Sequence, residues 1–359
     1  MSKRDVNEIE SYRFPSIDQS SSTIRLVKLL HSGNDESIEC IFRTFDLSKC
    51  PPYIALSYTW GLPGSTAEII LNGFPFAVGE NLHLALQAFR AKINCFSSDF
   101  DWEYFWIDAL CINQEDMVER NHQVALMSRI YSQAKLVVAW LGPEADESDL
   151  LLNSFKQSPS DKGGEKSTSE PISEEHLKQA IFAFRRHPCW TRLWIVQETI
   201  LVKEILLLCG SETCKWEELD NVPASCVEDH GLAASPCILA IKRRMAWREM
   251  PASDRGLYFL LGAFDSPQRI QCTDPRDRVF GLLGLTDGSE KGTMGLLHAD
   301  YRMSKKRIFF SVILHHMDDV ALRHESLLGN DNHNEFPAYL LGANWFMLRP
   351  QCTLEADLD

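Results

Sequence analysis

The stretch from Phe105 to Gly142, FWIDALCINQEDMVERNHQVALMSRIYSQAKLVVAWLG, decides the fold of this chain. It opens with a short apolar run and then breaks at a polar loop. The next segment, Glu115 to Ala134, contains no Gly or Pro and consists mostly of good helix formers. A second apolar run, Leu136 to Leu141, follows and stops at Gly142-Pro143. Strand, helix and strand in this order predict one parallel crossover.

One face of the predicted helix is apolar, and we expect it to lie on the sheet. That face comprises Met117, Val124, Met127, Ile130, Tyr131 and Ala134. Arg120 shares the face, and Gln123 lies at its edge. A buried Arg120 needs a partner, because an isolated charge away from water is very costly, and Asp108 and Asp116 are the nearest carboxylates.

The loop between the first strand and the helix is the expected ligand-binding edge. In open parallel sheets, ligands bind outside the carboxyl ends of the strands. The sequence therefore predicts a polar cluster there, made of Asp108, Asn113, Gln114, Arg120 and Gln123. Asp108 with Arg120 would form either a structural ion pair or a contact to a ribose or phosphate. Cys111 has no His nearby in sequence, which favours a core thiol over a nucleophile.

A second strand, Tyr53 to Gly61, is expected to end at the same edge. Its last residues carry hydroxyl groups and an indole. They would either pack the strand end or form a wall that stacks a base, and they are Ser57, Tyr58, Trp60 and Gly61.

The chain between these strands carries turn and cap signals. Asn72-Gly73 predicts a two-residue hairpin, and Pro75 places its second strand at an edge of the sheet. Asn81 is then predicted to cap a helix. The apolar stripe expected on this helix is Leu82, Ala85, Leu86 and Phe89.

A further helix is predicted from Pro188 to Ile200, with Trp190, Leu193, Val196, Gln197 and Ile200 on one face. Trp194 and Glu198 lie one turn apart, so their side chains are expected to meet. A partly desolvated carboxylate suits proton transfer or the stabilisation of a developing cation. The alternative is a helix-surface carboxylate paired with Arg192 or Lys203.

Composition excludes several classes of function. The net charge of −14 argues against nucleic acid as the main ligand, because phosphate binding needs clustered Lys and Arg. No apolar stretch approaches ~20 residues, so no membrane span is expected, and no signal region is visible. The eleven Cys and the His residues show no spacing typical of metal ligands, so no metal site is expected. Because the cysteines are scattered and odd in number, we expect free thiols and a reducing, cytoplasmic location.

Four regions are predicted: lead-in strands at 1–50, a main domain at 51–215, a helical module at 216–325 and an irregular tail at 326–359. The main domain contains a flexible Ser-rich insertion at about 143–172. Downstream, Asp274-Pro275-Arg276-Asp277 predicts a helix start with Asp274 as its cap. The fold class is α/β, with a mostly parallel sheet flanked by helices and a mainly helical C-terminal region.

Three blocks of sequence together resemble the fungal heterokaryon-incompatibility (HET) domain over roughly residues 50–210. The blocks are Ala55-Leu56-Ser57-Tyr58 with Trp60-Gly61; Trp106-Ile107-Asp108 with Cys111-Ile112-Asn113-Gln114, Glu119-Arg120 and Gln123; and Trp190, Arg192, Trp194 with Gln197-Glu198. The resemblance implies a role in non-self recognition and programmed cell death. It also implies death-signalling partners or self-association.

The HET family in turn looks like a distant relative of TIR domains, which implies a TIR-like or flavodoxin-like fold. In enzymatic TIR domains the Glu of a Trp-x-x-x-Glu helix is catalytic in NAD hydrolysis. The matching residues here are Trp194 and Glu198. By this analogy Glu198 is the expected catalytic residue, with NAD as substrate and no cofactor.

Two classes of function stay open at this point. The chain is either an enzyme that cleaves NAD-like dinucleotides or a non-catalytic signalling module whose toxicity comes from assembly. The enzyme hypothesis expects Glu198 in one cleft with Ser57, Trp60 and the loop 111–114.

Overall fold

In the computed structural model the chain divides into two compact units. Unit 1 comprises Met1–Arg120, Ala134–Ala180 and Lys203–Val222, and unit 2 comprises Asn121–Gln133, Ile181–Val202 and Pro223–Asp359. The residues that the structure describes are 12–30, 37–61, 63–92, 103–156, 174–221, 235–251, 255–257, 260–261, 270–286 and 297–315.

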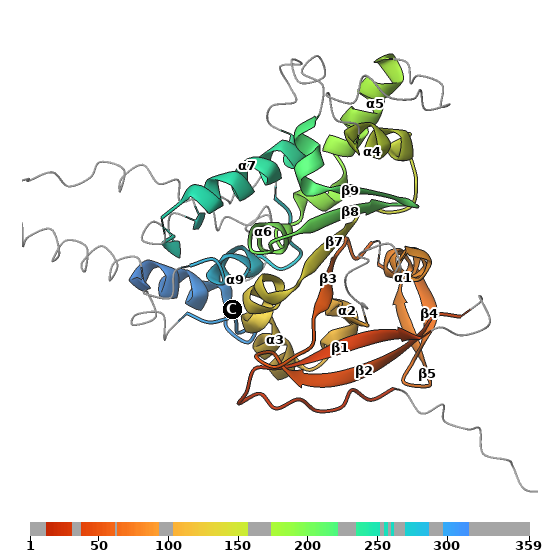
Figure 1. Cartoon of the computed structure of the whole chain (residues 1–359). Helices are drawn as coiled ribbons and strands as arrows, with labels where there is room; N and C mark the ends of the chain where they lie inside the picture. Colours follow the sequence, from red (N-terminus) through yellow and green to blue (C-terminus); the bar gives the residue numbers. More distant parts are fainter. Residues whose placement is uncertain are drawn as a thin grey trace, which may run out of the picture. The chain divides into compact units, whose positions relative to one another are not determined.

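Unit 1 is built on a nine-stranded sheet with the order β5-β4-β2-β1-β6-β3-β7-β8-β9 (Figure 1). The strands are β1 (Thr23–Leu30), β2 (Glu39–Asp46), β3 (Tyr53–Ser57), β4 (Thr66–Leu71), β5 (Phe74–Gly79), β6 (Tyr104–Trp106), β7 (Leu136–Trp140), β8 (Ile205–Cys209) and β9 (Glu212–Lys215). This architecture confirms the α/β class.

The sheet is mixed, which corrects the prediction of a mostly parallel one. Parallel ladders join β6 to β3, β3 to β7 and β7 to β8, and β2 pairs in parallel with β4. Antiparallel ladders join β1 to β2, β1 to β6, β4 to β5 and β8 to β9. The sequence pattern revealed the central crossover, but the hairpins that extend the sheet on both sides are antiparallel because short turns join their strands.

The expected crossover is present, although its first strand is shorter than predicted. The strand β6 ends at Trp106, and Asp108–Cys111 forms the short helix α2 instead of continuing the strand. The helix α3 (Met117–Gln133) and the strand β7 then follow close to their predicted bounds. Met117 was expected on the buried face, yet it is 41% exposed in the first turn of α3.

The hairpin between β4 and β5 has the expected form. Asn72 and Gly73 both adopt positive φ, at 52° and 84°, as a two-residue hairpin turn requires. The strand β5 is the edge of the sheet, as Pro75 predicted. The helix α1 (Glu80–Lys92) packs on β4 and β5 through its predicted stripe, which is fully buried: Leu82, Ala85, Leu86 and Phe89.

The remaining helices near the sheet are α4 (Ser148–Lys156), which packs on β9, and the 3-10 helix η4 (Trp216–Asn221). The helix α5 (Glu174–Arg185) has residues in both units, as does α3. The Ser-rich part of the predicted insertion and the tail after Glu325 lie outside the described residues. The predicted domain boundaries stay a prediction.

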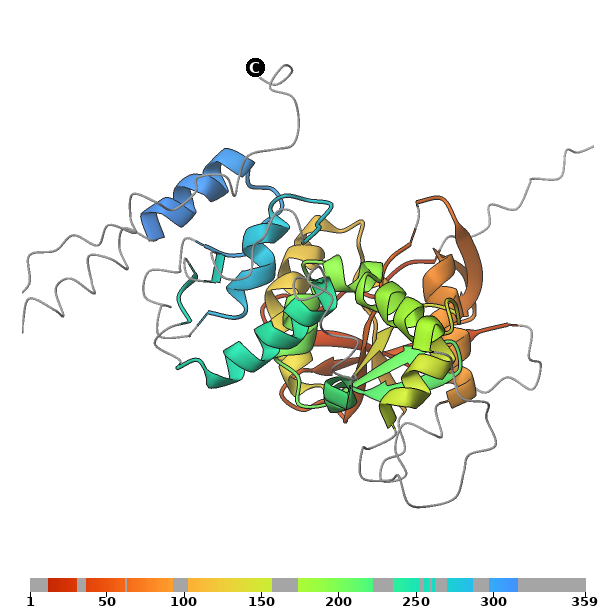
Figure 2. The same cartoon turned by 90° about the horizontal axis from the view of Figure 1, so that it is seen from above.

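Unit 2 contains the 3-10 helix η3 (Pro188–Thr191) and the helices α6 (Ile195–Ile200), α7 (Pro236–Glu249) and α9 (Asp277–Leu283), with a further helix over 305–315 (Figure 2). The helix α6 packs against both α7 and α9. An apolar core surrounds it, with Leu193, Val196, Ile200, Phe280 and Leu282 among its buried members.

The single helix predicted over 188–200 is wrong. Arg192 is extended, with ψ of 136°, and pairs as an isolated bridge with Gln271. This extended residue ends η3, and α6 begins only at Ile195. The predicted helix start at Asp274 is also displaced, since α9 begins at Asp277 and Asp274 instead pairs with Arg276 at 2.6 Å.

No helix in the described part of the chain is long and apolar enough to cross a membrane.

Candidate functional site

The strand order of unit 1 defines where a ligand crevice would form. After β3 the chain forms β4, β5 and α1 before it returns as β6 on one side of β3, and from β6 it crosses to β7 on the other side of β3. In doubly wound sheets this reversal marks the crevice at the carboxyl ends of the strands. The residues that follow β3, β6 and β7 therefore meet at one edge of the sheet, which we call the carboxyl edge.

Trp60 and Asp108 meet at the carboxyl edge. The Trp60 indole Nε1 donates to Asp108 Oδ2 at 2.9 Å, and the other oxygen of Asp108 accepts from the Ala109 amide at 2.7 Å. Trp60 is nevertheless 51% exposed. The carboxylate thus fixes the orientation of the indole while leaving aromatic surface open, which is the arrangement that stacking of a planar or cationic group needs.

Asn81 joins the carboxyl ends of β3 and β7. Its side-chain amide donates to the Thr59 carbonyl at 2.7 Å and to Thr59 Oγ1 at 3.0 Å, and its Oδ1 accepts from Trp140 Nε1 at 2.9 Å. The predicted capping role is therefore wrong, because α1 already begins at Glu80 and the Asn81 side chain turns toward the sheet. Sequence analysis missed both Asn81 and Trp140 as residues of this edge.

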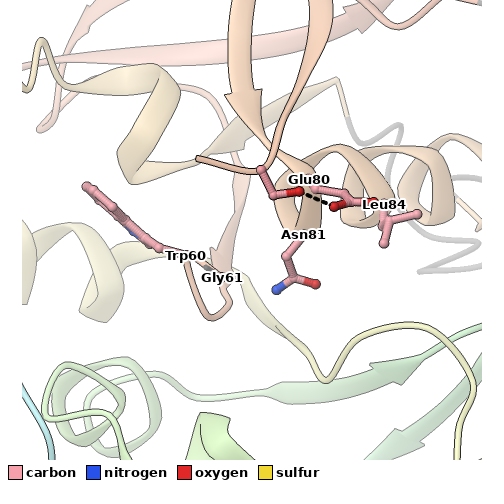
Figure 3. Close-up of a pocket in the computed structure, with 6 residues that line it drawn as sticks. Trp60, Gly61, Glu80, Asn81 and Leu84 are labelled. Atoms are coloured by element: carbon pink, nitrogen blue, oxygen red, sulfur yellow. Dashed lines mark hydrogen bonds between the residues drawn. The ribbon is translucent and has the colours of Figure 1, made fainter. Parts of the chain in front are cut away.

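A hollow of about 180 Å³ lies beside the turn that follows β3 (Figure 3). It is lined by Trp60, Gly61, Ser65, Glu80, Asn81 and Leu84. The Ser65 hydroxyl donates to the Glu80 carboxylate, which is the one charged group among these residues. A volume of about 150 Å³ suits a single benzene-sized group, whereas ligand pockets usually span roughly 300–1,000 Å³. The hollow alone is too small for a dinucleotide.

Ser57 and Tyr58 differ from the next residues of the turn. Ser57 is 3% exposed and Tyr58 is 2% exposed, so both side chains are buried at the strand end. Gly61 is exposed and has a φ of 85°, which explains the need for Gly there. The geometry therefore favours packing roles for Ser57 and Tyr58 and leaves Trp60 as the accessible side chain.

A buried ion pair lies next to the same edge, but its members are not those predicted. Arg25 of β1 is fully buried, and its guanidinium binds both carboxylate oxygens of Glu119, at 2.5 and 2.9 Å. Arg120, predicted to be the buried arginine, is half-buried. Asp116, its suggested partner, instead caps α3 by accepting from the amides of Val118 and Glu119.

Asn113 and Gln114 shape the loop between α2 and α3. The Asn113 amide donates to Glu119 Oε1 at 2.6 Å, and Gln114 Nε2 donates to the Asp108 carbonyl at 3.2 Å. Gln123 is fully buried, but it belongs to unit 2, where its amide lies 3.1 Å from His122 Nδ1. The predicted five-residue cluster is thus divided between the two units.

Cys111 is a core thiol. It is fully buried, its sulfur accepts from the Ile107 amide at 3.4 Å, and burial raises its pKa to about 12. A thiol with this pKa is protonated at neutral pH and is not a nucleophile. The preferred alternative from sequence is confirmed.

Glu198 occupies the first turn of α6 in unit 2 and is 2% exposed. Its carboxylate faces the Arg192 guanidinium, with distances of 3.2 Å from Nη1 to Oε2 and 3.4 Å from Nη2 to Oε1. Backbone hydrogen bonds on both sides fix Arg192: the Leu193 amide donates to the Gln271 carbonyl, and the Gln271 amide donates to the Thr191 carbonyl. The predicted pairing with Arg192 is confirmed, but the carboxylate lies in the core rather than on a helix surface.

Trp194 stands at the N-terminus of α6, where it is half-buried, and its carbonyl accepts from the Glu198 amide at 3.2 Å. The neighbouring Gln197 is 1% exposed and donates to the Gly281 carbonyl at 2.8 Å. The aromatic, basic and acidic residues from Trp190 to Glu198 thus build the packing around α6.

The candidate residues belong to both units. Ser57, Tyr58, Trp60, Gly61, Asp108, Asn113 and Gln114 lie in unit 1, and Trp194 and Glu198 lie in unit 2. The expectation of one cleft that contains them all stays a prediction.

Comparison with known proteins now identifies the region that carries these residues. Residues 53–198 match the family model described as Heterokaryon incompatibility protein (HET). This segment is similar to the HET family. The match begins at the first residue of β3 and ends at Glu198, so the HET segment includes Trp60, Asp108, Asn81 and the Arg192–Glu198 pair.

A curated protein is similar to the chain over most of its length. The chain is 27% identical, over 355 residues, to the Heterokaryon incompatibility protein 6, OR allele, of Neurospora crassa. The alignment covers 82% of this chain and 51% of the relative, so the chain spans about half the length of that relative. No solved structure matches the chain.

Proposed function

We propose that this chain acts in fungal heterokaryon incompatibility and triggers programmed cell death when non-self is recognised. The match of residues 53–198 to the HET model supports this proposal, as does the likeness to a Neurospora crassa incompatibility protein over most of the chain. Because the alignment covers only half of that relative, the part played by this chain in a death response is itself part of the proposal.

The proposed mechanism is TIR-like hydrolysis of NAD with Glu198 as the catalytic residue. The parallel core supports it, because β3, β6, β7 and β8 follow the spatial order second, first, third, fourth that begins the flavodoxin-like arrangement. A desolvated carboxylate stabilises an oxocarbenium-like ribosyl centre as nicotinamide leaves. Arg192 neutralises Glu198 in the free protein, so substrate must displace this guanidinium for the carboxylate to act.

The second proposal is a non-catalytic module whose toxicity comes from self-association or from binding other death-signalling proteins. The observation that favours it is the burial of Glu198 together with its two-point pairing to Arg192. A buried ion pair of this kind fixes local geometry without any chemistry.

Two substitutions of the same pair separate these proposals. Glu198→Gln removes the charge at nearly constant size, and Arg192→Gln breaks the same ion pair while keeping the carboxylate. If Glu198 is catalytic, purified Glu198→Gln loses NAD consumption entirely, whereas Arg192→Gln retains it in proportion to folded protein. Both variants are measured for NAD loss, for thermal unfolding and for toxicity in a fungal host.

A different outcome would exclude the enzyme mechanism. If toxicity survives in Glu198→Gln while cellular NAD stays constant, the carboxylate has no catalytic role and the non-catalytic module is supported. Equal losses of stability and toxicity in both variants would likewise assign the pair to structure alone. The family-level role in incompatibility would stand in either case.

A further inference from the structure

A short segment ahead of the first strand lies on the sheet of unit 1. We call residues 12–17 the strap. Its aromatic rings pack on neighbouring rings of the sheet: Tyr12 on Phe42 and Phe76 with centroid distances of 6.1 and 5.6 Å, and Phe14 on the same two rings at 5.9 Å each. The Tyr12 hydroxyl also accepts from Asn72 Nδ2 at 3.1 Å.

The strap covers the buried guanidinium of Arg25. The Phe14 ring centroid lies 5.2 Å from Arg25 Cζ, and the Pro15 carbonyl accepts from Arg25 Nη2. Arg25 reaches the carboxyl edge because β1 runs antiparallel to β6, with Val27 opposite Phe105. There its Nη1 donates to the Cys111 carbonyl at 3.1 Å.

Glu119 carries this contact into the loop that follows α2. Oε1 accepts from Arg25 and also from the Asn113 amide at 2.6 Å, while Oε2 accepts from the second arm of the guanidinium. The loop continues the connection, because Gln114 donates to the carbonyl of Asp108, whose side chain holds Trp60. One buried ion pair therefore touches both the strap and the loop 111–119.

We infer that the strap regulates the loop 111–119 through Arg25, so that displacement of the strap loosens the loop and the Trp60–Asp108 contact. Without the strap, Arg25 loses the Phe14 ring and the Pro15 carbonyl, and water reaches the ion pair. Charge pairs weaken steeply when water replaces protein around them. Glu119 then holds the Asn113 amide less firmly.

The strap has the properties of a displaceable element. It forms no helix or strand, and Arg13, Pro15 and Ser16 on it are exposed. Its aromatic side chains, Tyr12 and Phe14, are only half-buried, whereas the side chains of the central strand β3 are buried. Coupling of two sites is reciprocal, so a ligand that orders the loop also holds the strap in place. The coupling between strap and loop itself does not rest on NAD hydrolysis.

Hydrogen exchange measured by mass spectrometry on the full-length chain tests this inference. The double variant Tyr12→Ala/Phe14→Ala removes the aromatic contacts of the strap, including the Phe14 ring beside Arg25, and leaves the residues Arg25 and Glu119 themselves unchanged. We expect amide exchange in residues 111–119 to rise by roughly tenfold or more, within the usual range of site-to-site coupling. Exchange in β8 and β9, which belong to the same sheet, should stay unchanged.

The control variant is Glu103→Gln, which removes an exposed ion pair with Lys28, at 2.7 Å, from the same strand β1. It should leave the loop unaffected, because exposed pairs contribute little. A second variant, Glu119→Gln, should raise loop exchange by itself and should make the strap substitutions nearly without further effect. A deletion of residues 1–17 with the corresponding peptide added back provides an independent reading: the peptide should restore protection to the loop.

Unchanged exchange in residues 111–119 would overturn the inference. A rise spread evenly over the whole sheet would overturn it too, because the strap would then be an ordinary part of the core. Since exchange is read without substrate, either failure can be told apart from a failure of the proposed NAD hydrolysis.

Discussion

At the scale of single residues, hydrogen bonds from polar side chains connect the strands and loops that meet at the carboxyl edge. Asn81 connects Thr59 to Trp140, Asp108 fixes Trp60, and Arg25 with Glu119 links β1 to the loop after α2. Apart from the exposed Trp60–Asp108 bond, these bonds replace contact with water in half-buried or buried places. A lost partner there leaves a donor or an acceptor unsatisfied, which costs more than the net gain from an ordinary hydrogen bond.

Asn81→Ala removes three hydrogen bonds at once. We expect it to lower the free energy of unfolding by about 1–3 kcal/mol, because Trp140 Nε1 and Thr59 lose their partner. Denaturant unfolding measures the change, with Gln87→Ala on the exposed face of α1 as the matched control. A loss no larger than that of the control would show that water replaces Asn81 without cost.

Cys111 should resist alkylation in the folded protein. Its pKa of about 12 and its complete burial keep the thiolate scarce and out of reach. Among the cysteines that the structure describes, iodoacetamide at pH 8, followed by peptide mass spectrometry, should modify the half-buried Cys50 and Cys272 first. Early labelling of Cys111 in native protein would contradict the core assignment.

At the scale of elements, the loops that leave β7 and β8 approach each other closely. The Gly210 amide donates to the Gly142 carbonyl at 2.9 Å, and a Cβ built on Gly210 would meet the backbone nitrogen of Glu144 at 2.9 Å. Gly210 also has a φ of 53°. Two separate constraints, conformation and close approach, therefore select Gly at this position.

Gly210→Ala and Gly73→Ala form a matched pair that separates these constraints. Gly73 also has positive φ, but a Cβ there would meet nothing within 4 Å. We expect Gly73→Ala to cost about 1 kcal/mol from backbone strain, and Gly210→Ala to cost about 1–3 kcal/mol more because the loop after β7 must shift. Thermal unfolding of both variants provides the comparison; equal losses would mean that the loops adjust freely.

Local sequence signals predicted the elements whose cause is local. The Asn72-Gly73 turn and the buried stripe of α1 both follow from neighbouring residues, and both are confirmed. The continuous helix over 188–200 failed because a distant residue, Gln271, holds Arg192 extended. The antiparallel insertion of β1 between β2 and β6 also depends on pairing that no local pattern reveals.

In the candidate site too, the sequence predicted the residues placed by local pattern and missed the pairs that form over long distances in the chain. Trp60 and Asp108 could be named because each lies near the end of an apolar run in the sequence. Asn81 and Trp140 are 59 residues apart, and Arg25 and Glu119 are 94 apart, so only the folded sheet brings each pair together. One signal for Arg25 was available: an arginine inside the apolar run of β1 must find a buried partner.

At the scale of the whole molecule, each unit is assembled from separate stretches of the chain. Unit 2 combines Asn121–Gln133 with segments that begin at Ile181 and Pro223. Polar contacts tie these stretches together: Asn121 donates to Asp300 at 2.7 Å and accepts from the Tyr301 amide at 3.0 Å. The Tyr301 hydroxyl then donates to Asp277 at 2.5 Å. Residues far apart in sequence therefore share one hydrogen-bond network.

This network should make stability depend on pH in the acid range. Hydrogen bonds from Arg302 and Asn121 lower the pKa of Asp300 from 3.8 to about 2. A lowered folded-state pKa adds stability above the unfolded value, and that stability is lost as pH falls from about 4 to about 2. The gain should reach about 1–2 kcal/mol, because exposed Arg302 is partly screened by solvent.

Unfolding of Asp300→Asn across pH 2 to 6 measures this contribution. The variant should be less stable than the wild type at pH 6 and should lose less stability on acidification. Parallel curves for the two proteins would show that Asp300 does not contribute to acid sensitivity.

The nine-strand order has a consequence for anyone who excises the HET segment. The strands β1, β2, β8 and β9 lie outside residues 53–198, yet β1 flanks β6 and β8 flanks β7 in the interior of the sheet. In a recombinant fragment cut at the family boundaries, backbone amides and carbonyls would lose their hydrogen-bond partners on the side of β6 that faces β1 and on the side of β7 that faces β8. Exposed strand edges of this kind pair with strands of other molecules. We expect that fragment to aggregate, and a soluble fragment to need breakpoints ahead of the strap and beyond β9.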